Sequence, residues 1–108
     1  MSHILIDRVA RTWSDASQHC EFLGGRLASI LNSQREKEIL AAVHAAADFT
    51  APRLWIGGND IEQDGTWRWA GTSRYVGGFT RWAANEPNGR TTENCMEMRV
   101  QSRRWNDS

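Results

Sequence analysis

The first half of the chain carries two runs of apolar residues with the three- and four-residue spacing of a helix. The first run follows Thr12, whose hydroxyl is placed to accept a hydrogen bond from the backbone three residues on, and it stops at Gly24-Gly25. A capping hydroxyl and a terminal glycine are typical of the two ends of a helix. We therefore predict a helix between them, with an apolar stripe formed by Trp13, Ala16, Cys20 and Leu23.

A second helix is predicted between Ser33 and Pro52. Ser33-Gln34-Arg35-Glu36 has the pattern of a capping box, in which the serine and the glutamate satisfy each other's backbone N–H groups. Pro52 closes the region because proline cannot continue a helix. The apolar stripe of this helix is predicted to consist of Ile39, Leu40, Val43 and Ala47.

Strands are predicted where the apolar residues alternate or form short continuous runs. These segments are residues 3–9, 54–57, 66–69 and 95–100, with a polar turn over residues 59–65. Residues 70–94 have little periodicity, and Phe79 and Trp82 argue against disorder there, so we expect a functional loop. The whole chain, residues 1–108, is predicted to be one α+β domain, with two helices followed by short antiparallel strands that carry a long loop.

Composition excludes some classes of partner. Thirteen basic residues balance thirteen acidic ones, so no positive excess indicates binding to nucleic acid. No stretch is long and apolar enough to predict a transmembrane helix, and residues 1–7 lack the apolar region of a signal peptide. Cys20 and Cys95 could pair with each other, pair with other partners or stay reduced, and composition alone does not decide.

Five side-chain oxygen donors are concentrated within 22 residues near the end of the chain. They are carboxylates and neutral amides, the ligands that a hard cation such as Ca²⁺ prefers. Each also has a simpler interpretation: a turn around Asn88-Gly89, a solvated charge at Glu93, or a turn after a buried Trp105. The five candidate ligands are Glu86, Asn88, Glu93, Asn106 and Asp107.

Taken together, the five donors favour a metal site. Glu93 directly precedes the strand predicted at residues 95–100, and Asn106-Asp107 follow it, so the loop that carries Glu86 can fold over the same end. Three carboxylates brought to one place repel one another unless a cation neutralises them. The sequence therefore predicts a metal site at this end of the strand.

Segments along nearly the whole chain also carry a family resemblance. They are Thr12-Trp13-Ser14-Asp15-Ala16, Cys20, residues 24–30, Trp55-Ile56-Gly57-Gly58, Gly65-Thr66-Trp67-Arg68-Trp69, Glu86-Pro87-Asn88, Glu93-Asn94-Cys95 and Trp105-Asn106-Asp107. In this order and spacing they resemble the first helix, the core strand, the next hairpin and the Ca²⁺ and sugar site of C-type lectin-like domains.

The resemblance implies a primary Ca²⁺ site built from those five residues. In the family the peptide bond before the motif proline, here Glu86-Pro87, is cis, and two vicinal sugar hydroxyls complete the coordination of the ion. The Glu-Pro-Asn order implies mannose, N-acetylglucosamine, glucose or fucose, whereas the reversed Gln-Pro-Asp order goes with galactose. The resemblance also implies a glycan-binding protein outside the cell or at its surface, as an oligomer or within a larger protein.

Two parts of the family pattern are incomplete in this chain. Asp60 and Asp64 lie where relatives place ligands of an auxiliary ion, but Gly89 and Asn94 stand where further acidic ligands are expected, so we leave that site unassigned. The family continues beyond the Trp-Asn-Asp motif with a last strand and two cysteines, which would pair with Cys95 and Cys20. We therefore expect an incomplete domain that lacks its last strand, with both cysteines deprived of these partners.

Two other functions compete with Ca²⁺-dependent sugar binding. A lectin-like domain can recognise a protein without sugar, although there would then be little reason to keep all five ligands. A glycosidase could use Glu86 and Glu93 as acid and base, but a shared cation would hold both ionised and make a poor general acid. No Ser/His/Asp, Cys/His or phosphate-loop pattern supports other catalysis, so we expect a binding module rather than an enzyme.

Overall fold

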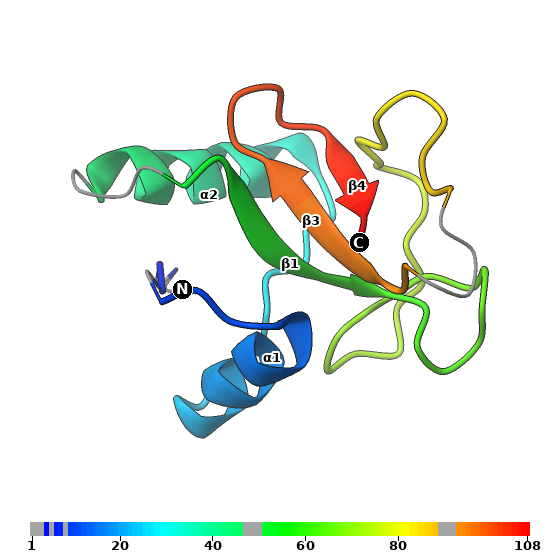
Figure 1. The fold of residues 1–108 in the computed structure, drawn as a ribbon. Coiled ribbons are helices and arrows are strands. Elements are labelled where there is room, and N and C mark those ends of the chain that lie inside the picture. Colours follow the sequence, from blue (N-terminus) through cyan, green and yellow to red (C-terminus); the bar gives the residue numbers. More distant parts are fainter. Residues whose placement is uncertain (1–3, 5, 8, 47–50, 89–92) are drawn as a thin grey trace.

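A computed structural model describes residues 4, 6–7, 9–46, 51–88 and 93–108 and shows two helices and one antiparallel sheet (Figure 1). The sheet has the strand order β2-β1-β3-β4. The α+β class predicted from the sequence is confirmed. The elements are α1 (Trp13–Phe22), α2 (Ser33–Ala45), β1 (Arg53–Asn59), β2 (Arg68–Trp69), β3 (Cys95–Arg99) and β4 (Trp105–Asp107).

Helix α1 is closed at both ends by local interactions, as predicted. The backbone N–H of Asp15 donates to Thr12 Oγ1 at 3.1 Å, which satisfies one of the free donors of the first turn. Gly24 has a φ of +86°, a left-handed conformation that glycine adopts without a steric cost. The predicted stripe is wrong at Leu23, which is 51% exposed because it caps the helix, whereas Trp13 and Ala16 are buried.

Helix α2 begins differently from the prediction. Its capping residue is Asn32 and not Ser33, since the backbone N–H of Arg35 donates to Asn32 Oδ1 at 2.8 Å. The capping box is therefore wrong, and Glu36 is buried instead of facing the helix start. Ile39, Leu40 and Val43 are buried as predicted, while Ala47 lies outside the described residues.

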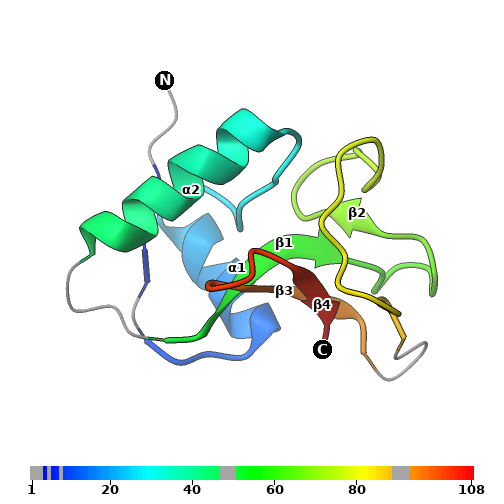
Figure 2. The same cartoon turned by 90° about the horizontal axis from the view of Figure 1, so that it is seen from above.

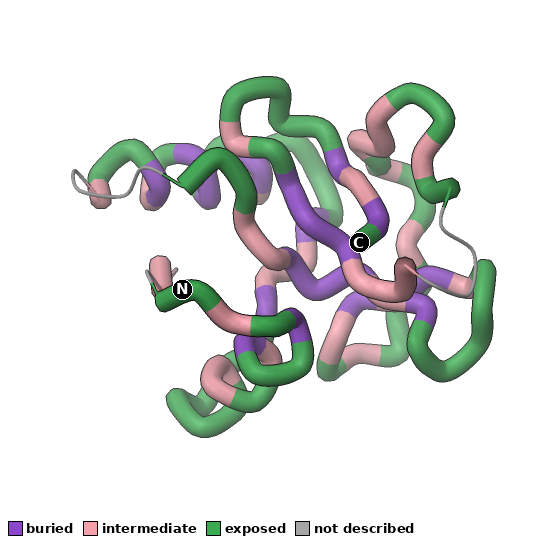
Figure 3. Tube along the Cα trace, in the orientation of Figure 1, coloured by how far each residue is buried: buried purple, intermediate pink, exposed green. Residues whose placement is uncertain are grey.

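The two faces of the sheet pack against different helices. In β1, Ile56 belongs to the large core that contains Ile39 and Leu40 of α2. Its neighbour Trp55 packs against the small cluster that contains Trp13 of α1. Successive strand residues point to opposite faces, so the helices cover opposite sides of β1, as Figures 1 and 2 show. Figure 3 shows the buried residues following β3 and the centre of β1.

Strand β3 lies at the centre of the pairing. Leu54 of β1 stands opposite Met98, and on the other side Met98 stands opposite Trp105 of β4. Met96 and Met98 are fully buried on one face, as the alternation predicted. Glu97, on the other face, is also buried, and its carboxylate pairs with Arg53 at 3.5 Å and Arg99 at 3.2 Å.

Two predicted strands differ from the structure. The described residues between 4 and 10 form no strand, and the side chain of Asp7 instead pairs with Arg11 at 2.7 Å just before α1. The strand predicted over residues 66–69 is reduced to β2, although Trp67 and Trp69 are buried as expected. Within the described part of the chain, no helix is long and apolar enough to cross a membrane.

The two cysteines both pack against the small cluster around Trp13, and both are free thiols in the structure. Burial raises the pKa of Cys95 to about 11 and also raises the pKa of Cys20. Both side chains are therefore held as thiols, and the conceivable Cys20–Cys95 disulfide is not formed.

Candidate functional site

Strand β4 carries two of the predicted ligands at fixed positions against β3. Asn106 stands opposite Glu97, and Asp107 stands opposite Met96. The pairing continues at Ser108, whose N–H donates to the carbonyl of Cys95 at 2.7 Å. Asp107 is therefore held between ladder hydrogen bonds, and it is only 1% exposed.

The long loop returns along the outer side of β4. The backbone N–H of Trp105 donates to the carbonyl of Arg81 at 2.7 Å, and the N–H of Ala83 donates to the carbonyl of Trp105 at 2.9 Å. Trp82 and Trp105 form a parallel bridge between these bonds. The N–H of Glu86 then donates to the carbonyl of Ala83 at 3.0 Å. These bonds bring the Glu86 segment, distant in sequence, back to the end of β4, where the yellow segment lies in Figure 2.

Beneath this segment lies a cluster of aromatic rings centred on Trp105. Its ring meets those of Trp69, Phe79 and Trp82 edge to face, with centroids 5.5, 6.2 and 6.0 Å away. Edge-to-face rings at this spacing attract one another beyond the area they bury. Trp105 is fully buried, so it forms a firm base for the two ligands that follow it in β4.

The electrostatics show that Glu86 lies in the field of two other predicted ligands. Burial is the main cause that raises the pKa of Glu86 to about 7. Asp107 raises this pKa further through a hydrogen bond and through its charge, and the charge of Glu93 acts in the same direction. A backbone hydrogen bond from Asn88 opposes them. In addition, Glu86 Oε1 is buried and has no hydrogen-bond partner. Among the described residues, no positive side chain is therefore recorded as a partner of an ionised Glu86.

The donor chemistry at this place fits Ca²⁺. Glu86 lies beside Asp107 and within the field of Glu93, and Asn88 and Asn106, which carry amide oxygens, are close to Glu86 and Asp107 in sequence. Among the described residues, no three acidic, histidine or cysteine side chains converge tightly enough to hold a metal by themselves. Any cation here would thus also depend on the amides. Asn88 is exposed, and the four residues after it lie outside the described part of the chain.

The peptide bond between Glu86 and Pro87 is cis, as the family resemblance predicted. Asn85, directly before it, has a φ of +66°. The motif lies within the segment that hydrogen-bonds to β4.

Asp60 has a structural role that explains its burial. It is 3% exposed, and its Oδ2 accepts a hydrogen bond from the N–H of Gly65 at 2.8 Å, which closes the turn over residues 60–65. Burial raises the pKa of Asp60, and the Gly65 hydrogen bond opposes this rise. Asp64 is exposed. The auxiliary ion site therefore stays unassigned.

One residue pair near the site was missed in the sequence. Glu36 of α2, which is 2% exposed, pairs with Arg81 at the start of the returning segment. A signal was present, since Glu36 lies three and four residues before Ile39 and Leu40 on the apolar stripe. An acidic residue on a buried face requires a cationic partner, although the sequence does not say which one.

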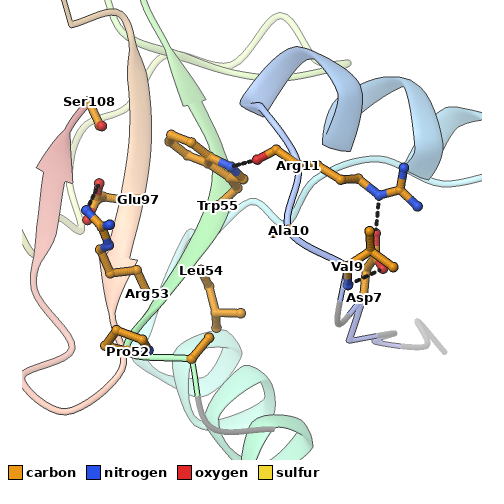
Figure 4. Close-up of a pocket in the computed structure, with 11 residues that line it drawn as sticks. Asp7, Val9, Ala10, Arg11, Pro52, Arg53, Leu54, Trp55, Glu97 and Ser108 are labelled. Atoms are coloured by element: carbon orange, nitrogen blue, oxygen red, sulfur yellow. Dashed lines mark hydrogen bonds and ion pairs between the residues drawn. The ribbon is translucent and has the colours of Figure 1, made fainter.

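A groove of about 400 Å³ lies elsewhere, between the N-terminal segment and the sheet (Figure 4). Arg11, Arg53, Trp55 and Glu97 are among the residues that line it, and Trp55 Nε1 donates to the carbonyl of Arg11 at 2.8 Å. None of the five predicted ligands lines this groove. It is therefore separate from the candidate site.

The family model of the Lectin C-type domain matches residues 9–108. The chain belongs to this family. This C-type lectin domain is 34% identical over 104 residues to an alpha-N-acetylgalactosamine-specific lectin of Patiria pectinifera, covering 90% of this chain and 61% of that protein. The chain spans about three fifths of the length of this relative and of two other lectins that it matches.

Solved structures agree with this C-type lectin fold. The carbohydrate-recognition domain of cow CD23, crystallised in the presence of a GlcNAc2Man3 oligosaccharide, is 27% identical with a TM-score of 0.72, over 91% of this chain and 70% of that one. A calcium-independent type II antifreeze protein is 30% identical with a TM-score of 0.72, over 89% of this chain and 68% of that one. The fold is thus shared by proteins described with and without a bound sugar.

Proposed function

We propose that this domain binds carbohydrate through one Ca²⁺ ion held by Glu86, Asn88, Glu93, Asn106 and Asp107. The observation that carries the proposal is the half-buried carboxylate of Glu86, which lies beside Asp107 in the field of Glu93 and has one oxygen without a partner. Like charges in one place are unfavourable unless a cation offsets them. The sugar-binding relatives support a role in recognition rather than in catalysis.

The proposed ligand side chains differ in whether they can donate or accept hydrogen bonds to a sugar. Bound Ca²⁺ would supply a strong electrostatic contact for two neighbouring sugar hydroxyls. The carboxylates of Glu86 and Glu93 can only accept hydrogen bonds from those hydroxyls, whereas the amide groups of Asn88 and Asn106 can donate. A hydroxyl held between a carboxylate and an amide would thus have both its donor and its acceptor capacity satisfied.

The proposed ligands are sugars of the mannose type, including N-acetylglucosamine and fucose. The order Glu86-Pro87-Asn88 supports this preference, and the oligosaccharide in the cow CD23 structure contains mannose and N-acetylglucosamine. The N-acetylgalactosamine-specific relative shows that the family also includes other preferences. We propose further that the protein acts at the cell surface or outside the cell, where glycans are displayed.

Retention on immobilised mannose, with galactose as the matched control resin, tests this function. We expect elution from mannose by a chelator and by free mannose, with little retention on galactose. Retention that survives the chelator would refute the Ca²⁺ mechanism, and preference for galactose would refute the sugar assignment. Incubation of the same protein with mannoside substrates should give no hydrolysis product, which distinguishes a lectin from a glycosidase.

A second candidate function is recognition of a non-sugar partner. The calcium-independent antifreeze protein with the same fold supports it, because that protein is described as working without Ca²⁺. On this alternative, the acidic residues of the site would hold no ion, and titration calorimetry with Ca²⁺ would show no heat of binding.

A further inference from the structure

We propose that the ion pair between Glu36 and Arg81 is a positioning device for the candidate ligand site. It fixes the returning loop segment, and through it Glu86, against α2 and β4. The inference rests on the proposed function for its effect on Ca²⁺, but the positioning itself is measurable in the metal-free protein.

Glu36 and Arg81 form a bidentate ion pair, which is called the clamp below. Arg81 Nε donates to Glu36 Oε2 at 3.0 Å, and Arg81 Nη2 donates to Glu36 Oε1 at 3.2 Å. Two parallel hydrogen bonds from the planar guanidinium fix the orientation of the arginine as well as its distance. The guanidinium also lies over the ring of Phe79, with Cζ 5.0 Å from the centroid. Arg81 is thus held by a buried glutamate of α2 on one side and by its own loop on the other.

Backbone hydrogen bonds connect Arg81 to the segments that carry the predicted ligands. The Arg81 carbonyl accepts from the N–H of Trp105, the residue directly before Asn106 and Asp107. Two residues later, Ala83 bonds to the same Trp105, and the N–H of Glu86 bonds to Ala83. A continuous series of hydrogen bonds therefore joins the clamp to both parts of the ligand set.

A purely stabilising role explains the pair less well than a positioning role. Removing both charges from water is costly, and an apolar pair of similar volume would often stabilise a fold equally or better. The pair of Arg35 and Glu38 lies on the same helix, 3.1 Å apart and partly exposed. It provides a control, since Glu38→Gln removes one charge from α2 at a partly exposed side chain whose partner is on the same helix.

The test compares Glu36→Gln, Arg81→Lys and Glu38→Gln in the full chain. Tb³⁺, excited through the nearby tryptophans, reports on occupancy of the site, and competition with Ca²⁺ gives the affinity. Hydrogen exchange of the amides of Ala83 and Trp105 reports on the returning segment without metal. Arg81→Lys keeps a cation beside Glu36 and therefore retains the fold even if Glu36→Gln does not.

We expect Glu36→Gln to weaken Ca²⁺ binding by about tenfold or more, as supporting contacts of metal ligands typically do. Arg81→Lys should weaken it by a smaller factor because lysine lacks the planar fork, and Glu38→Gln should leave it within about twofold. In the metal-free protein, exchange at Ala83 and Trp105 should rise selectively in both clamp variants.

Two results overturn the inference. Unchanged Ca²⁺ affinity in folded clamp variants would show that the pair does not position the ligands. A uniform rise in exchange across α2 and the sheet, with no selective rise at Ala83 and Trp105, would show a general loss of stability. If the wild type binds neither Tb³⁺ nor Ca²⁺, the proposed function fails, and the exchange pattern alone then decides whether the pair positions the segment.

Discussion

Replacing Glu86 by glutamine is expected to stabilise the metal-free domain at alkaline pH while it abolishes Ca²⁺ binding. In the metal-free protein, the ionised carboxylate of Glu86 is unfavourable because it is partly buried and because it lies in the field of Asp107 and Glu93, with no cation among the described residues acting on it. An amide of nearly the same shape removes this repulsion. The same substitution removes one charged ligand, so Ca²⁺ should no longer be held.

The size of the effect follows from the pKa of Glu86, which is about 7 in the folded protein against an ordinary value of 4.5. Since one pKa unit corresponds to about 1.4 kcal/mol, this difference represents at most about 3.5 kcal/mol of unfavourable free energy. Glu86 is only half-buried, so solvent and salt screen part of it. We expect a gain in the free energy of unfolding of about 1–2 kcal/mol at pH 8.

The sign depends on pH in a defined window. Below about pH 4.5, the carboxyl of Glu86 is protonated in both the folded and the unfolded states and contributes no difference. Between about 4.5 and 7 the unfolded state loses its proton while the folded state keeps it, so the stability of the wild type falls as pH rises. Above this window the full penalty is present, and the advantage of the glutamine variant should be largest.

Urea unfolding in the presence of a chelator, at pH 8 and at pH 4.5, measures both effects. Glu21, an exposed glutamate on α1, provides the matched control, and Glu21→Gln should change stability equally little at both values of pH. If Glu86→Gln is less stable than the wild type at pH 8 without metal, the carboxylates do not repel one another as the structure indicates. In a separate measurement, adding Ca²⁺ should stabilise the wild type and leave the stability of the Glu86→Gln variant unchanged.

Four further outcomes are expected. The double substitution Glu86→Gln with Asn88→Asp should shift preference from mannose toward galactose in competition binding, and retained mannose preference would contradict the role of the motif. Arg81→Met should lower the free energy of unfolding by about 3–5 kcal/mol in urea, since it leaves the buried Glu36 carboxylate without its partner. Gly57→Ala should lower the urea midpoint as well, because its Cβ would lie 3.0 and 3.1 Å from the carbonyl oxygens of residues 27 and 28. Ca²⁺ affinity, measured by calorimetry, should fall as pH is lowered, because protons compete for the carboxylate ligands.

Local features of the fold were predictable because they depend on neighbours in sequence. The Thr12 cap, the Gly24 stop and the burial of Met96 and Met98 all follow from patterns within a few residues. The start of α2 was predicted one residue too late, because Asn32 and Ser33 are both good capping residues and the local sequence does not choose between them.

Contacts between distant segments were not predictable in the same way. The bridge between Trp82 and Trp105 is a parallel pairing that leaves no periodic signal in either segment. The partner of Glu36 lies 45 residues away and can be identified only once the loop is placed. For the candidate site, the sequence predicted which five residues could bind an ion. That Glu86 lies close to Asp107 could be seen only in the structure.

The turn between β3 and β4 has a consequence for how this domain can vary. Arg103 takes a left-handed φ of +65°, and its N–H donates to the carbonyl of Arg99 at 2.8 Å, which fixes where β4 begins. Since alternate strand residues face opposite sides, a one-residue slip of β4 against β3 would exchange the sides of Asn106 and Asp107. Residues 101–104 of the turn are exposed and include no predicted ligand, so most of its amino acids can change, whereas position 103 favours residues that tolerate a left-handed φ. The length of the turn can change as well, provided that β4 keeps its register against β3.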